Sequence, residues 1–164
     1  MVSEETEAVL LSLNNQREHI LGALEGLSDP DLRRPVLPTG WTCLGLVRHL
    51  ALDVERFWFR AAVAGEQVEL MSGADAWNVP AGTPASSVLD LYRDEIARAN
   101  AIIAATNPDA MPKWWPAEIF PGFPPRPLRK TILHVITETA CHAGHLDAVR
   151  ELIDGRTWLI LTGT

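Results

Sequence analysis

The 164-residue sequence predicts an all-α fold, a bundle of four long helices. Three observations support this class. Apolar residues recur every three or four positions in four segments, proline and glycine separate these segments, and no stretch has a convincing partner as a β-strand. With 47% hydrophobic residues and no low-complexity block, we expect one compact domain over residues 1–164.

The first predicted helix covers residues 5–27. Its apolar side chains share one face at helical spacing: Val9, Leu10, Leu13, Ile20, Leu21, Leu24 and Leu27. Three prolines follow at positions 30, 35 and 38. Because proline lacks an N–H and restricts the residue before it, we expect the chain to turn there.

The second predicted helix begins after Trp41, with Thr42 as its N-cap, and ends near Ala64, where Gly65 is a natural stop. Its apolar residues cover more than half of its circumference. This pattern predicts a helix that is buried on several sides.

A connection over residues 66–82, which we expect Trp77 to order, leads to the third predicted helix. Thr83 and Pro84 suit its beginning, because a hydroxyl cap followed by proline satisfies or avoids the first unpaired N–H groups. We expect this helix to end near Thr106.

A proline-rich loop over residues 107–127, which contains Trp114 and Trp115, precedes the fourth helix. Loops of this length in compact domains are usually functional or disordered. The fourth helix is predicted over residues 128–153, with Gly155 at its end.

The apolar tail of residues 156–161 follows this helix and has no partner strand in the sequence. Burial of its apolar side chains would be favourable. We therefore expect the tail to dock on the bundle or on a second subunit.

Charge and hydropathy exclude two classes of partner. The chain has 14 basic and 21 acidic side chains, whereas nucleic-acid binding needs concentrated Lys and Arg. The longest apolar runs fall far short of the roughly 20 residues that cross a bilayer.

An acidic N-terminus and two widely separated cysteines favour the cytoplasm. A small molecule is the expected partner.

Three of the five histidines lie in the fourth helix together with a carboxylate. At about 100° per residue these four side chains lie within about 80° of one another, on one stripe: His134, Glu138, His142 and His145. Glu138 and His142 have the i, i+4 spacing from which two side chains can reach one ion. A third ligand has to come from another helix, and His49 is the candidate because its neighbours are apolar. Such a set leaves a coordination position open, as a catalytic divalent metal requires.

Each of these residues also has an ordinary structural explanation. A lone histidine such as His49 is commonly a core residue with one hydrogen bond, and Glu138 with His142 is typical of a surface pair. A charged carboxylate on an inward face, however, needs a cation. Metal binding and a structural pair are therefore equal alternatives on these residues alone.

Two expectations concern the surroundings of this stripe. Asp53 is four residues after His49, so it either accepts a hydrogen bond from the imidazole or pairs with Arg56 or Arg60. Residues 114–115 are candidates for the mouth of a pocket.

The cysteines and the known catalytic signatures add little. We expect Cys141 to be a small buried hydrophobe rather than a metal ligand, and Cys43 to pack near the start of its helix. The sequence contains no Walker-type phosphate loop, HExxH, GxSxG, paired CxxC or Rossmann fingerprint. Nucleotide-binding proteins, serine hydrolases and zinc fingers are therefore disfavoured.

Two stretches resemble the DinB/YfiT-like superfamily. Residues 40–51, Gly-Trp-Thr-Cys-Leu-Gly-Leu-Val-Arg-His-Leu-Ala, followed by Glu-Arg-Phe-Trp-Phe at 55–59, resemble its second helix. Residues 138–151, Glu-Thr-Ala-Cys-His-Ala-Gly-His-Leu-Asp-Ala-Val-Arg-Glu, resemble its last bundle helix. The resemblance covers residues 8–155.

This resemblance implies a four-helix bundle in up-down-down-up order, frequently dimeric, with a divalent ion held by helix two and the last helix. Carried over by position, the ligands are His49, Glu138 and His142. Glutamate at position 138 is similar to the mycothiol-dependent maleylpyruvate isomerase type, whereas many relatives have histidine there. Characterised relatives use mycothiol, bacillithiol or glutathione.

The resemblance therefore implies a metal-dependent thiol S-transferase. The ion, most simply Zn²⁺ and otherwise Ni, Mn or Fe, would stabilise a thiolate that attacks an electrophile near residues 107–127. His145 would support the site or move a proton. The alternatives are a non-catalytic dimeric bundle that binds a metal or small molecule in a stress-related role, and a metal-dependent hydrolase.

Overall fold

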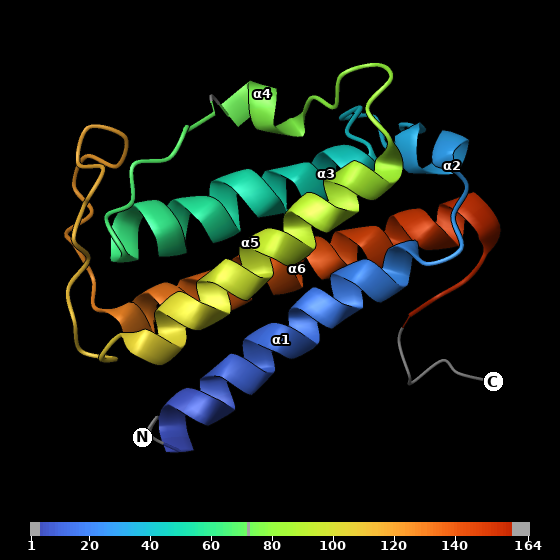
Figure 1. The fold of residues 1–164 in the computed structure, drawn as a ribbon. Helices are drawn as coiled ribbons and strands as arrows, with labels where there is room; N and C mark the ends of the chain where they lie inside the picture. The colour runs from blue at the N-terminus through green and yellow to red at the C-terminus, as the bar shows by residue number, and fades with distance from the viewer. Residues whose placement is uncertain (1–3, 72, 159–164) are drawn as a thin grey trace.

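The computed structural model describes residues 4–71 and 73–158, and within them it is all-helical, which confirms the predicted class. The long elements in Figure 1 are α1 (Glu4–Leu24), α3 (Cys43–His49) continuing as η1 (Leu50–Val63), α5 (Ala85–Ala105) and α6 (Leu128–Asp154). Two short helices, α2 (Asp29–Arg33) and α4 (Gly73–Trp77), lie in the connections. No described helix is both long and apolar enough to cross a membrane.

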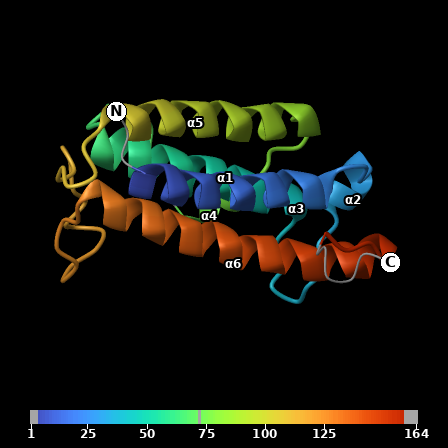
Figure 2. The ribbon, with the colours of Figure 1, turned by 90° about the horizontal axis from the view of Figure 1, so that it is seen from below.

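The long helices pack as rods around one core. α1 lies mainly against α6, and α5 lies against α3 and η1. In Figure 1, α1 and α6 begin at the end of the molecule where η1 and α5 finish, and in Figure 2 α1 runs between α5 and α6. Buried side chains from all of them fill the centre, among them Leu13, Leu46, Tyr92 and Val135.

The helix that carries His49 changes its hydrogen-bond register part-way. It begins as predicted, with the Thr42 hydroxyl accepting a hydrogen bond from the N–H of Gly45 at 3.0 Å. From Leu50 onward it is a π-helix, and at its end the N–H of Ala64 donates to the carbonyl of Phe59, five residues back. Most of η1 is buried, as predicted, but the 3.6-residue period did not predict the π register. π segments are rare and recur at functional sites.

The crossover between η1 and α5 is held closely against α3. A Cβ at Gly45 would collide with the backbone carbonyl of Trp77, so only glycine permits this approach. Arg48 donates hydrogen bonds to the backbone carbonyls of α4. Trp77 lies beside His49 and packs, partly buried, against the core; that it orders the connection stays a prediction.

The sequence analysis missed one short helix and misplaced one helix cap. The segment after α1 does not only turn: it forms α2, with Ser28 as N-cap and proline in the first turn, where a missing N–H is tolerated. The predicted Thr83 hydroxyl cap is wrong, because Pro84 is itself the N-cap of α5 and no side chain caps this helix. The Thr83 carbonyl instead accepts a hydrogen bond from Arg33.

The ends of α6 and of the described chain agree with expectation. Gly155 terminates α6 with a left-handed φ of +76°. Trp158 stacks on His19, with ring centroids 5.8 Å apart, and covers Gly22, where an added Cβ would clash with the indole. Docking of the tail on the bundle is thus confirmed at Trp158, while residues 159–161 lie outside the described residues.

Residues 107–127 form the predicted irregular loop, and both of its ends are anchored. The N–H of Trp114 donates to the carbonyl of Ala62 near the end of η1, at 3.1 Å. The N–H of Leu128 donates to the carbonyl of Ala110 at 3.0 Å, which closes the base of the loop.

A buried ion pair that the sequence analysis missed crosses the core. Nε and Nη2 of Arg17 donate to the two carboxylate oxygens of Glu55 at 2.7 and 2.6 Å, and these side chains are only 2% and 1% exposed. Arg17 also donates to the side-chain carbonyls of Asn14 and Asn100. Burial raises the pKa of Glu55, and the Arg17 charge opposes this shift.

Candidate functional site

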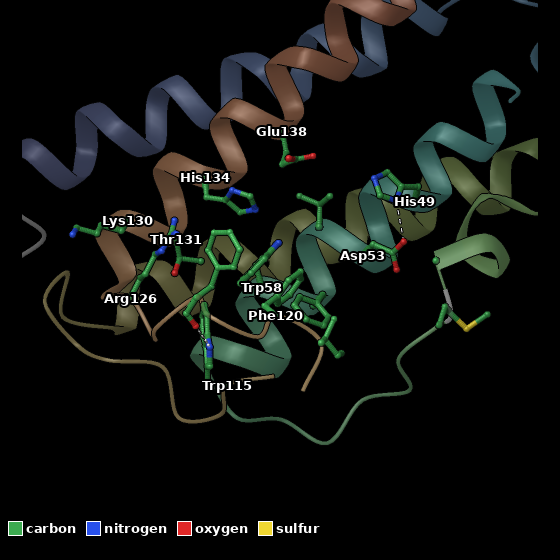
Figure 3. A pocket seen from close by; sticks show the side chains of 16 residues that line it. His49, Asp53, Trp58, Trp115, Phe120, Arg126, Lys130, Thr131, His134 and Glu138 are labelled. Carbon is green, nitrogen blue, oxygen red and sulfur yellow. Dashed lines mark hydrogen bonds and ion pairs between the residues drawn. The ribbon is translucent and has the colours of Figure 1, made fainter. Parts of the chain in front are cut away.

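A pocket of about 490 Å³ lies between η1, α6 and the loop of residues 107–127 (Figure 3). Pockets of about 300–1,000 Å³ are the size that holds small molecules. Aromatic side chains form much of its lining, and Trp58 stacks on Phe120 with ring centroids 5.6 Å apart. His49, Asp53 and Glu138 lie together at one end, where η1 faces α6 (Figure 3).

His49, the last residue of α3, is fixed on two sides. Its Nδ1 lies 2.9 Å from Oδ2 of Asp53, and Trp77 stacks on the ring at a centroid distance of 4.3 Å. A proton on Nδ1, donated to the carboxylate, leaves Nε2 with a free lone pair, the form in which imidazole binds metals. Of the two alternatives for Asp53, the structure supports the contact with His49.

The competing partners of Asp53 are engaged elsewhere. Arg56 and Arg60 both donate to Oε1 of Glu95, at 2.7 and 3.0 Å from their nearest nitrogens. Glu95 is 2% exposed, so these arginines neutralise a buried carboxylate of α5. Asp53 therefore remains available to orient the imidazole.

Glu138 and His142 of α6 lie next to His49, as the stripe predicts. Nε2 of His142 is 3.8 Å from Oε2 of Glu138, and the imidazole centroids of His142 and His49 are 5.2 Å apart. Burial, together with the neighbouring His49 and His145, lowers the pKa of His142 to about 4. His142 is therefore neutral at pH 7, and its buried Nδ1 has no hydrogen-bond partner among the described residues.

The other two histidines of the stripe lie on either side of this group. His145 is 5.6 Å from His142 and 6.4 Å from Trp41, measured between ring centroids, and it is exposed. His134 packs edge-on against Trp58 inside the pocket, at 4.9 Å, and burial lowers its pKa. His145 thus borders the candidate ligands, whereas His134 borders the aromatic lining.

Of the three candidate ligands, the pair Glu138 and His142 fits a divalent ion in chemistry and spacing, but among the side chains that the structure describes no group of three His, Cys, Asp or Glu residues is placed to hold a metal ion. Two donors on one Zn²⁺, each about 2.0–2.1 Å from it, lie no more than about 4.2 Å apart. The Glu138 to His142 distance of 3.8 Å meets this limit. The buried Nδ1 of His142 has no hydrogen-bond partner among the described residues, so, unlike the ring of His49, this imidazole is not oriented by a carboxylate.

Only one of the two cysteines lies in its expected environment. Cys43 is buried near the start of α3, as predicted, and burial raises the pKa of its thiol to about 11. Cys141 is exposed, so its prediction as a buried hydrophobe is wrong. Because α6 is oriented with Glu138 toward the pocket, Cys141 faces solvent.

We expect the two thiols to differ strongly in alkylation. At pH 8, Cys141 should react with iodoacetamide in minutes, while Cys43 should react only after denaturation, because the thiolate is the nucleophile and its population at Cys43 is small. Mass spectrometry should find one adduct on the native chain and two in denaturant. The Cys141→Ser variant should show none when native; rapid labelling of that variant would contradict the buried position of Cys43.

Several pocket residues escaped the sequence analysis. Trp58 and Phe120 resemble ordinary core aromatics in the sequence, and Arg126 lies in a proline-rich run without periodicity. Of the two tryptophans expected at a pocket mouth, Trp115 lines the pocket. Trp114 instead packs edge-on against Phe57, with centroids 6.0 Å apart.

Comparison with known proteins agrees with this arrangement. The family model described as Mycothiol-S-transferase matches residues 8–155. The chain belongs to the mycothiol S-transferase family. A comparison with curated proteins finds no match. Membership of the mycothiol S-transferase family confirms the DinB/YfiT-like resemblance and indicates a thiol S-transferase-like function with a small thiol as cosubstrate.

Proposed function

We propose that this member of the mycothiol S-transferase family conjugates a low-molecular-weight thiol, mycothiol in the first instance, to an electrophile. A divalent ion, most simply Zn²⁺, would be held by His49, Glu138 and His142. The observation that carries the proposal is that His142 lies beside both His49 and Glu138, which come from two distant stretches of the chain and line one end of an aromatic pocket.

Bound at this position, a divalent ion would supply the charge that lowers the pKa of a coordinated thiol toward neutrality. The protein's own groups prepare the position for it. The Asp53 carboxylate orients the imidazole of His49, and the stack with Trp77 limits rotation of the ring. A neutral His142 can offer a nitrogen lone pair at pH 7.

The rest of the pocket would receive the electrophile. Trp58, Trp115 and Phe120 present apolar surface that excludes water from one side of the reacting thiol. His145 is proposed to accept or relay the thiol proton, because it is exposed to solvent and its ring lies 5.6 Å from that of His142.

The decisive experiment measures metal and thiol dependence together. Protein purified without an affinity tag should contain about one divalent ion per chain by elemental analysis. It should also conjugate mycothiol to 1-chloro-2,4-dinitrobenzene faster than buffer does, with bacillithiol and glutathione as alternative thiols. Dialysis against a chelator should remove ion and activity, and added Zn²⁺ should restore both.

Two outcomes would support the alternatives instead. Folded, metal-free protein without turnover on any thiol would favour a non-catalytic bundle and overturn the proposal. Turnover of a panel of esters or amides that requires metal but no thiol would favour a hydrolase that uses metal-bound water.

Three further expectations stay predictions: the up-down-down-up order, the homodimer and the cytoplasmic location.

A further inference from the structure

The pocket has acidic side chains at one end and basic side chains at the other. Asp53 and Glu138 lie at the end with the candidate metal ligands, while Arg126 and Lys130 lie at the opposite end, where α6 begins (Figure 3). Residues 130 and 138 are about 12 Å apart along the axis of α6, at 1.5 Å per residue. The cationic end is notable in a chain with a formal net charge of −7.

Among the side chains that the structure describes, the positive groups at this end take part in no ion pair. No described carboxylate pairs with Arg126 or Lys130, and the guanidinium of Arg126 lies over the ring of Phe123 at 5.5 Å. The neighbouring Arg129 contrasts with them, because it pairs with Asp109 at 2.8 Å and does not line the pocket.

Backbone groups cannot take the place of these side chains. The first N–H groups of α6 already donate to carbonyls, Leu128 to Ala110 and Arg129 to Pro108. An anion at this end would therefore be bound by side chains. Arg126 is half-buried, and its planar guanidinium matches the two oxygens of a carboxylate, whereas Lys130 is exposed at the rim and adds a mobile charge.

The surface between the two ends is apolar and aromatic. Trp58, Trp115 and Phe120 line it, and flat rings pack well on such surfaces. A ligand that entered in the opposite sense would bring its negative group to Asp53, Glu138 and the bound thiolate, whose three negative charges outweigh the two positive charges of the proposed ion. The charges therefore favour a single orientation for an anionic ligand.

From this arrangement we propose that the pocket selects aromatic electrophiles that carry one anionic group. The anion would bind Arg126, assisted by Lys130, and the reactive carbon would point toward His49 and Glu138. This inference rests on the proposed thiol-transfer function and specifies its substrate class.

The reaction is a substitution that needs no redox partner. With 4-chloro-3,5-dinitrobenzoate, the thiol sulfur forms a bond to the ring carbon that carries chlorine. The carbon–chlorine bond breaks with its electron pair on chloride, and the thiol proton passes to solvent. The carboxylate, opposite the reacting carbon on the ring, takes no part in the chemistry.

A matched pair of substrates tests the inference. The selectivity, defined as kcat/KM for 4-chloro-3,5-dinitrobenzoate divided by kcat/KM for its carboxamide, should exceed one in the unmodified protein after correction for the uncatalysed rates. In Arg126→Gln this ratio should fall about 10- to 100-fold, the value of a charge-assisted hydrogen bond. Most of the change should be in KM for the benzoate. Lys130→Gln should lower the ratio less.

Arg129→Gln is the matched control, since it removes the same charge three residues further along, in the first turn of α6 but outside the pocket. The ratio should not change in this variant. An equal fall in Arg129→Gln and Arg126→Gln, or no fall in Arg126→Gln, would overturn the inference while leaving thiol transfer intact.

A binding measurement separates this inference from the proposed function. Unreactive 3,5-dinitrobenzoate should quench the fluorescence of the pocket tryptophans at lower concentrations than 3,5-dinitrobenzamide, without thiol or added metal. The preference should disappear in Arg126→Gln. Preferential binding without conjugation of any thiol would refute the proposed function but retain the anion site, whereas equal binding of both compounds would refute the anion site.

Discussion

Replacing His142 by alanine is expected to abolish both metal binding and thiol transfer. The variant should lose more than about 100-fold in metal affinity, because even groups that only support a ligand are worth about 10- to 100-fold. His49→Ala and Glu138→Ala should behave alike, since each would leave two protein ligands. Elemental analysis and kcat/KM with mycothiol measure the two effects on the same preparations.

Matched variants separate ligand loss from general damage. His134→Gln changes a histidine on the same stripe that packs on Trp58, so its metal content should stay at about one ion per chain. Asp53→Asn should retain the ion more weakly, by about 10- to 100-fold, because the carboxylate only orients His49. Circular dichroism verifies folding. Full metal content in folded His142→Ala would refute the assigned ligand set.

Replacing Arg17 by methionine is expected to cause the largest loss of stability. The change leaves the Glu55 carboxylate buried without its cation, and breaking such pairs costs about 3–5 kcal/mol. Urea unfolding at pH 7 measures the loss. Arg93→Gln, which removes the exposed ion pair with Asp90, is the control and should cost less than about 1 kcal/mol.

The pH dependence of this loss follows from the shifted pKa of Glu55. Burial raises this pKa and Arg17 opposes the rise, so the variant should have a still higher folded-state pKa. A folded pKa above the unfolded one gives stability that is present at low pH and lost as pH rises through the folded value. The destabilisation of Arg17→Met should therefore shrink on acidification. The Arg17→Met, Glu55→Met double variant should recover much of the stability and lose this pH dependence.

The sequence predicted the helices far better than their interior polar contacts. Apolar spacing and the caps at Thr42 and Gly155 located the long elements, because helix periodicity and end chemistry are local properties. The pair of Arg17 with Glu55 was missed, since nothing local in the sequence shows that two charged residues 38 positions apart meet in the core.

For the candidate site, the sequence predicted the contacts within single helices but not the pocket that surrounds them. The i, i+4 spacing of Glu138 with His142, and of His49 with Asp53, predicted contacts within a helix, and both occur. The aromatic lining and Arg126 could not be predicted, because they depend on how the loop of residues 107–127 folds over η1. Proline-rich loops have no period from which a face can be deduced.

The anchoring of that loop has an evolutionary consequence. Its base is closed by backbone hydrogen bonds, Leu128 to Ala110 and Trp114 to Ala62, which impose little requirement on side-chain identity. The span between these ties bears Trp115 and Phe120, which line the pocket and pack on Trp58 of η1. Substitutions and insertions there would change the shape of the pocket lining without moving His49 and His142. New ligand preferences can therefore arise without loss of the fold's stability.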